Sequence, residues 1–255
     1  MDITPEELIK LKDLVQRIAS NQTMEQAGKL YDHGLANYKS SNYSVSMAQF
    51  QAVIETGDPY YMPPAVWMVY TLHRQFKDRA NELATLKRFV SLPPESSRFI
   101  DPENLGIAYI KLGDAANAVK HYSLAIKQNG ETPARIANLA EAYLVSGDYR
   151  NSLELADKLV TQSEVKYLLL GRVFKGASLW FMGQHPQALS EFQFIGSFLA
   201  STGGLPANFS WDFGDSAQIL DRIESPVIRT VVEVLSGRTN FDTFRQSWLG
   251  ATASA

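Results

Sequence analysis

Residue types that often carry catalysis or bind metals are few in this sequence, and none falls in a recognisable pattern. The four histidines, His33, His73, His121 and His185, are far apart, and none lies in a zinc-binding His-Glu-x-x-His motif. The absence of cysteine excludes disulfides, thiolate metal sites and a cysteine nucleophile. The sequence therefore predicts no metal site and no cofactor.

Motifs of common enzyme classes are also missing. The chain has no Gly-x-Ser-x-Gly nucleophile motif, and Gly171 to Gly176 lacks the Gly-Lys-Ser/Thr order of a phosphate-binding loop. The adjacent carboxylates Glu6 and Glu7 begin an expected helix, where they interact favourably with its dipole. The sequence thus indicates a protein that is not an enzyme and has no catalytic residue.

Regular spacing appears instead among structural residues. Residues 104–114 and 138–148 share Asn, Leu, Ala, Tyr, Gly and Asp at one offset, since 138 − 104 and 147 − 113 both equal 34. A third copy follows at an offset of 36 (183 − 147), and an earlier copy begins near residue 27. Residues 63–92 keep only the apolar spacing of a degenerate copy. A period of about 34 residues is typical of paired-helix repeats.

Each copy carries small residues where two helices must approach each other. The expected first-helix positions are Gly34, Gly106, Ala140 and Gly176, and the second-helix positions are Ser46, Ala118, Ser152 and Ala188. Four residues later comes a larger apolar residue, which we expect to fill the space between repeats: Phe50, Tyr122, Phe192 and, as a weak instance, Ala156. Gly113, Gly147 and Gly183 lie where the first helix must end and the chain must turn.

Residues 104–114 and 138–149 resemble the helix-turn-helix pattern of the tetratricopeptide repeat family, and the resemblance covers roughly residues 24–200. It implies an all-α, right-handed superhelical solenoid of helix pairs. We therefore expect an N-terminal capping helix in residues 1–23, a repeat domain in 24–200, a loop and C-terminal helices in 201–249, and a tail in 250–255.

The two flanks have their own patterns. Residues 5–19 form an amphipathic helix that caps the first repeat or mediates self-association, with its apolar stripe at Leu8, Leu11, Leu14, Val15 and Ile18. After residue 200 comes a loop whose apolar residues predict that it lies against the repeats: Leu205, Phe209, Trp211 and Phe213. Residues 214–223, 226–236 and 240–249 are expected to form short helices.

Stacked repeats expose the first helix of each pair on a concave surface. The candidate partner-binding residues on that groove are Tyr31, Leu35, Tyr38, Asn104, Ile107, Ile110, Asn138, Glu141, Leu144 and Trp180, and Lys111 lies beside them. The family resemblance implies that Asn104 and Asn138 bond the backbone of an extended peptide; alternatively, they bond only a neighbouring helix or water. Burial between repeats or beneath the C-terminal helices is the alternative for Leu144 and Trp180.

Composition limits the partners. The net charge is −3 and there is no long basic run, so nucleic acid is not an expected partner. No stretch approaches about 18 uninterrupted apolar residues, and no signal peptide is visible, so we expect no membrane insertion and a cytoplasmic protein. The predicted function is a protein–protein interaction scaffold or adaptor, possibly chaperone-like, that binds a partner's peptide or helix. The alternative is a self-assembling structural protein that forms homo-oligomers through repeat ends.

Overall fold

The computed structural model describes residues 5–207 and 209–253, with side-chain environments for residues 21–207 and 209–249. The regular secondary structure of the described part is helical throughout and includes no strand, as the repeat pattern predicts. It divides into two compact units, Met1–Asp101 and Pro102–Ala255. The division falls inside the segment 24–200 that the sequence assigns to one repeat domain, so each unit is described by itself.

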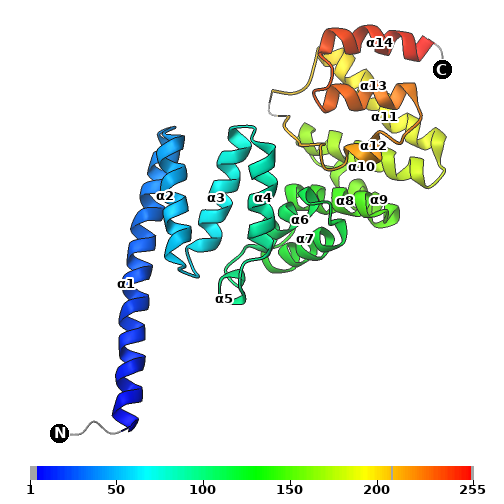
Figure 1. Ribbon diagram of the computed structural model, residues 1–255. Coiled ribbons are helices and arrows are strands. Elements are labelled where there is room, and N and C mark those ends of the chain that lie inside the picture. Colours follow the sequence, from blue (N-terminus) through cyan, green and yellow to red (C-terminus); the bar gives the residue numbers. More distant parts are fainter. Residues whose placement is uncertain (1–4, 208, 254–255) are drawn as a thin grey trace. The chain divides into compact units, whose positions relative to one another are not determined.

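The first unit consists of two helix pairs and a short helix. Its elements are α1 (Pro5–Lys39), α2 (Tyr43–Thr56), α3 (Met62–Gln75), α4 (Arg79–Val90) and α5 (Pro94–Ser97). Helix α1 pairs with α2 and α3 pairs with α4, while α2 packs on α3 to join the pairs (Figure 1). The degenerate copy is thus a complete helix pair.

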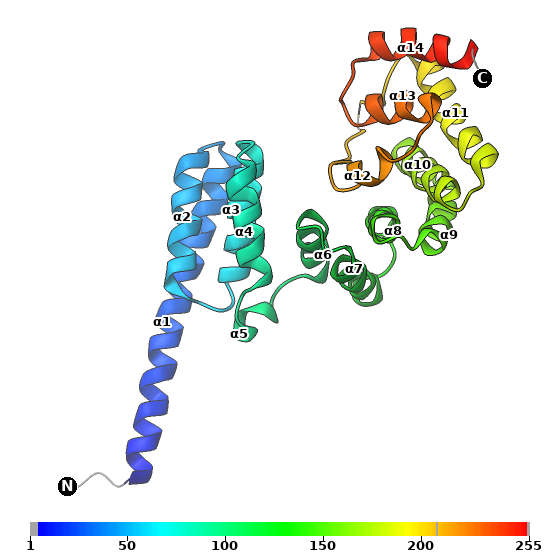
Figure 2. The same cartoon turned by 45° about the vertical axis from the view of Figure 1, so that its right-hand side comes forward.

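Helix α1 is longer than the sequence predicts. The expected helix break near residue 23 does not occur, because α1 is continuous from Pro5 to Lys39. Its first half extends beyond the end of α2 in Figures 1 and 2. The apolar stripe from Leu8 to Ile18 lies outside the residues whose side chains are described, so capping by residues 5–19 stays a prediction.

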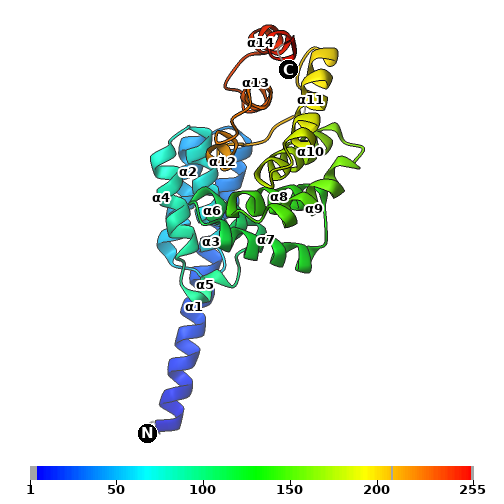
Figure 3. The ribbon, with the colours of Figure 1, turned by 90° about the vertical axis from the view of Figure 1, so that its right-hand side faces the viewer.

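The second unit contains four helix pairs. Its elements are α6 (Pro102–Lys111), α7 (Ala115–Asn129), α8 (Pro133–Ser146), α9 (Tyr149–Val160), α10 (Val165–Phe181), α11 (His185–Thr202), α12 (Ala217–Leu220), α13 (Pro226–Leu235) and α14 (Phe241–Ala253). Helix α13 packs on both α14 and α11 (Figure 3). One apolar core runs through α8 to α14, so the predicted C-terminal helices belong to the same core as the last repeats.

The turn inside each of the six helix pairs contains one residue with positive φ. In the α13–α14 pair this residue is Gly237, and in the five earlier pairs these residues are Ser41, Lys77, Gly113, Gly147 and Gly183. The spacings between these five are 36, 36, 34 and 36 residues (77 − 41, 113 − 77, 147 − 113 and 183 − 147). The N–H group of the next residue donates to a carbonyl five residues back, for example Asp114 to Tyr109. This bond satisfies a carbonyl at the end of the first helix.

An aspartate then begins the second helix in three of these turns. Its two carboxylate oxygens accept hydrogen bonds from the backbone N–H and the side-chain amide of the asparagine three residues later. The pairs are Asp78–Asn81, Asp114–Asn117 and Asp148–Asn151. Such a cap stabilises a helix start by about 1 kcal/mol. Because the Asp78–Asn81 cap lies within residues 63–92, it aligns this degenerate copy with the two copies that have the Asp114 and Asp148 caps.

The small residues act as predicted, and the large residues pack against them within the same pair; Tyr122 also shares a buried cluster with Leu139 and Ala142 of the next pair. A Cβ atom added at Gly34, Gly106 or Gly176 would lie 2.5–2.8 Å from the ring of Phe50, Tyr122 or Phe192, respectively. Each ring therefore packs against the glycine of its own helix pair, and each pair is separated by 16 residues (50 − 34, 122 − 106 and 192 − 176).

The remaining copy has a compensating change at both positions. Ala140 and Ala156 have the same separation of 16 residues (156 − 140), and both are completely buried. In this copy, Ala140 thus replaces the glycine of the first helix, and Ala156 replaces the aromatic residue of the second helix. Gly171 brings α10 equally close to α9, since a Cβ there would lie 2.8 Å from the backbone nitrogen of Val160.

The glycine–ring contact predicts that Gly106→Ala changes the free energy of unfolding in opposite directions in the wild type and in a Tyr122→Ala background. Gly106→Ala places a methyl group against the Tyr122 ring and should lower the free energy of unfolding by about 1–3 kcal/mol. In a Tyr122→Ala background, the same change should raise it by about 0.5–1 kcal/mol, because alanine favours the helix. Urea denaturation of the four proteins measures both effects.

Ala116→Gly is the control, because Ala116 is exposed on the neighbouring helix α7. Its effect should be the same with Tyr122 or Ala at position 122. An equal effect of Gly106→Ala in the two backgrounds would contradict the packing argument.

Candidate functional site

The chain between α11 and α12 returns to the first helices of three consecutive pairs. We call residues 209–216 the crossing segment. It is non-helical, as the ribbon shows (Figures 1 and 2). Its side chains contact α6, α8 and α10. We call the residues that receive it, Lys111, Glu141 and Phe174, the acceptor face.

Lys111 binds the two aspartates of the crossing segment. Its Nζ lies 2.9 Å from Asp212 Oδ2 and 3.1 Å from Asp215 Oδ2. The Lys111 side chain is only 4% exposed, while the side chain of Asp212 is 44% exposed. Burial of an ammonium group is costly unless it is paired, so the two carboxylates are required partners for Lys111 in this position.

Glu141 lies one pair further along and binds the same segment. Its Oε1 accepts a 2.7 Å hydrogen bond from the Ser216 hydroxyl, and its Oε2 accepts a 3.2 Å bond from Trp211 Nε1. Burial raises the pKa of Glu141 from 4.5 to about 8, and the negative charge of Asp215 contributes in the same direction. The hydrogen bonds from Ser216 and Trp211 oppose this shift. At neutral pH the Glu141 carboxyl group is therefore mostly protonated.

Trp211 extends the contact to α10. Its ring lies 6.2 Å from the Phe174 ring in an edge-on arrangement, and Lys166 Nζ lies 5.8 Å from its centroid. Phe213 is 4% exposed and belongs to the core of the second unit. The prediction that Trp211 and Phe213 lie against the repeats is thus confirmed. Asp212 and Asp215 were missed, because their partner Lys111 is about a hundred residues earlier in the sequence.

The predicted groove residues of the second unit fall into two groups. Leu144, Glu141 and Ile110 are 0%, 5% and 6% exposed. A partner cannot contact them while they are buried, and for Glu141 the cause is the crossing segment. The others are partly exposed: Asn104, Ile107, Asn138 and Trp180. Trp180 stacks on His185 with ring centroids 4.2 Å apart. Ile107 packs against a cluster of buried side chains from α6, α7 and α8.

The predicted groove residues of the first unit are all partly exposed. Tyr31 lies between two rings, with centroids 5.4 Å from Phe50 and 5.7 Å from Tyr61. Burial raises its pKa above the usual value. The ring of Tyr38 lies beside that of Tyr43 on α2, with centroids 5.7 Å apart. Leu35 lies between Tyr31 and Tyr38 in the sequence of α1. The two tyrosines thus pack within the first unit, and all three side chains are partly exposed.

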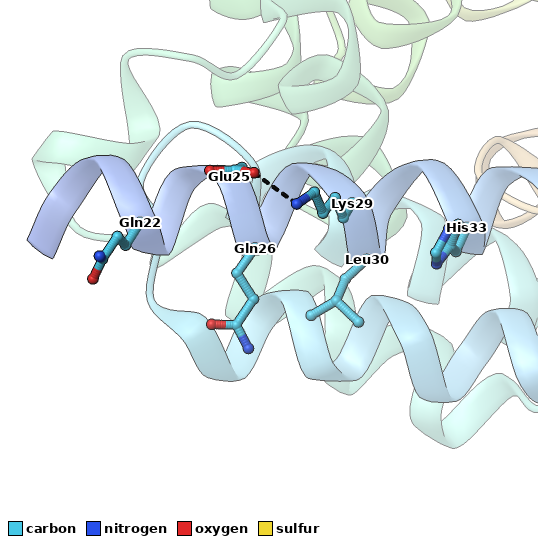
Figure 4. A pocket seen from close by; sticks show the side chains of 6 residues that line it. All are labelled: Gln22, Glu25, Gln26, Lys29, Leu30 and His33. Atoms are coloured by element: carbon cyan, nitrogen blue, oxygen red, sulfur yellow. Dashed lines mark hydrogen bonds and ion pairs between the residues drawn. The ribbon is translucent and has the colours of Figure 1, made fainter.

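A shallow, open depression of about 430 Å³ lies along α1 (Figure 4). Its lining residues are Gln22, Glu25, Gln26, Lys29, Leu30 and His33. All six come from one helix, and Glu25 and Lys29 form an ion pair with each other at 2.6 Å. Polar groups from a second element do not line the depression, so its residues do not converge on a reacting atom.

The histidines are dispersed in the structure as they are in the sequence. His33 and His185 are exposed, and His73 lies 3.7 Å from Asp78. His121 is partly buried, with its ring stacked on Tyr109. Burial lowers the pKa of His121. Among the described residues, no group of three or more His, Cys, Asp or Glu side chains could hold a metal ion.

No protein-family model matches the chain, and no curated protein is significantly similar to it. In the part of the chain that the structure describes, none of the helices combines the length and apolar character needed to cross a membrane.

The raised pKa of Glu141 predicts a specific pH dependence. The folded protein holds the Glu141 proton up to about pH 8, whereas the unfolded chain releases it near pH 4.5. The stabilising contribution is complete below pH 4.5 and is lost as the pH rises towards 8. Between pH 4.5 and pH 7 the loss is on the order of 3 kcal/mol. Glu141→Gln cannot titrate, so its free energy of unfolding should decline less over this range.

Urea denaturation at several pH values measures the difference. Glu154→Gln removes an exposed carboxyl group from α9 and should keep the wild-type profile. If wild type and Glu141→Gln had parallel profiles, the buried carboxyl group would not be protonated in the folded protein.

Proposed function

We propose that the chain is a non-enzymatic scaffold of the tetratricopeptide type, which binds a peptide or helix of a partner protein along the first helices of its pairs. The contact between the acceptor face and the crossing segment carries the proposal. There, three first helices bind a non-helical segment through its tryptophan, aspartate and serine side chains. A surface with this chemistry is suited to binding an extended peptide.

The first unit has related features on its first helix. Tyr31, Leu35 and Tyr38 reach the surface of α1, and aromatic side chains are frequent energetic centres of protein interfaces. Lys39 is exposed and lies two residues before the turn residue Ser41, as Lys111 lies two residues before Gly113. These features support partner binding at the same face of the first pair.

The repeat type and its handedness are part of the proposal. The repeated turn and the 16-residue glycine–ring spacing support the resemblance to tetratricopeptide repeats. In this proposal the helix pairs stack in a right-handed superhelix. Asn104 and Asn138 are partly exposed on α6 and α8 and keep their proposed role as hydrogen-bonding groups for a peptide backbone.

Site-specific photo-crosslinking tests the proposed face. A photoreactive amino acid at position 35 on α1 should crosslink a partner in cells of the native source, because that side chain reaches the first-helix surface. The same amino acid at position 48 is the matched control, because Ala48 is exposed on the second helix α2. Mass spectrometry of the crosslinked products identifies the partner.

The products also distinguish the two candidate functions. A different protein crosslinked at position 35 at least about tenfold more than at position 48 supports the scaffold, since one well-formed contact changes affinity by about that factor. Crosslinks between two copies of the chain favour self-assembly. Equal yields at positions 35 and 48 would remove the first-helix face from the proposal.

A further inference from the structure

The crossing segment contacts the acceptor face as a bound peptide would. Its side chains contact three separate helices, at Lys111 on α6, Glu141 on α8 and Phe174 on α10. Its chain is irregular, and several of its residues stay exposed, including Ser210, Asp212 and Gly214. The contact is therefore made by selected side chains of a chain that lies across the helices.

The chemistry of the contact is selective. Lys111 is buried and binds carboxylates, whereas the buried Glu141 carboxyl group accepts hydrogen bonds from an indole N–H and a hydroxyl. A buried polar network adds less stability than an apolar contact of equal size, but it rejects segments that leave its groups unpaired. The acceptor face thus discriminates in favour of a segment with a tryptophan followed closely by acidic residues.

We infer that the acceptor face is a docking surface for an acidic, tryptophan-containing segment of a partner protein, and that the crossing segment of this chain is its resident competitor. The inference rests on the proposed function and specifies the ligand class of the second unit. Charge complementarity supports this occupant, because Lys111 and Lys166 both face the segment and its carboxylates lie on Lys111.

The tether makes the internal competitor strong. A segment held on a short linker has an effective concentration of about a millimolar or more, so an external segment with the same contacts displaces it only at comparable concentration. The crossing segment is joined to α11 through Gly203 and Gly204, which both have positive φ. After it, Leu220 and Ile223 are buried in the core, so both ends of the segment are anchored, and displacing the segment would also expose the buried side chain of Phe213.

Binding of a labelled synthetic peptide tests the inference. The probe has the sequence of residues 206–217 of this chain, and fluorescence anisotropy measures its affinity for the full-length protein. In the variant Trp211→Ala/Asp212→Asn the internal segment loses its indole and one carboxylate, while Asp215 still pairs with Lys111. The peptide should bind this variant at least tenfold more tightly than wild type.

Two controls identify the binding site. Adding Lys111→Met to the variant should abolish peptide binding, and a peptide with both changes, Trp211→Ala and Asp212→Asn, should not bind. Equal affinity for wild type and variant, or binding that persists without Lys111, overturns the inference. Crosslinking at position 35 in the first unit tests the scaffold proposal separately, so the two can fail independently.

Hydrogen exchange of the wild type covers the case in which a variant does not fold. If the crossing segment is displaceable, its amides exchange by local opening, at least tenfold faster than the central amides of α8 and α10. Exchange of the segment only together with those helices means that it is a permanent part of the core, and the inference is then wrong.

Discussion

The fold depends on the close approach of two helices at a glycine. Gly34, Gly106 and Gly176 leave room for an aromatic ring that lies directly on the first helix of its pair. The buried rings of Phe50 and Phe192 supply much of the apolar area that holds the pairs together. A first helix that buries one side against its partner in this way has another side available for further contacts. In α6, α8 and α10 that other side carries the acceptor face.

In the second unit, part of that remaining side is covered by the chain itself. Glu141 and Lys111 could not stay buried beneath an apolar cover, because both would lose the water that hydrates them without gaining a partner. The crossing segment supplies an indole, a hydroxyl and two carboxylates at the required positions. The hydrogen-bonding and charged groups of the acceptor face and the crossing segment are thus complementary, which is the property expected of a recognition surface.

The sequence predicted the parts of the fold that depend on local rules. Gly113 and Gly147 indicated the turns because glycine adopts positive φ without strain, and the period of 34 followed from them. Lys77 occupies the same turn conformation but gives no such signal, so the degenerate copy was recognised only by its apolar spacing. The Asp-x-x-Asn caps would have located it, since Asp78 and Asn81 recur as Asp114 and Asn117.

The candidate site was harder to predict, because its groups meet across long separations in the sequence. Glu141 and Leu144 have the helical spacing of surface positions, and only the crossing segment, some seventy residues later, explains why Glu141 is buried. Two carboxyl groups, those of Asp212 and Asp215, lie on the ammonium group of Lys111, while Glu141 binds Ser216 and Trp211. Burial is the largest cause of the raised pKa of Glu141, and the charge of Asp215 adds to it. Glu141 therefore keeps its proton at neutral pH because water is excluded from its carboxyl group.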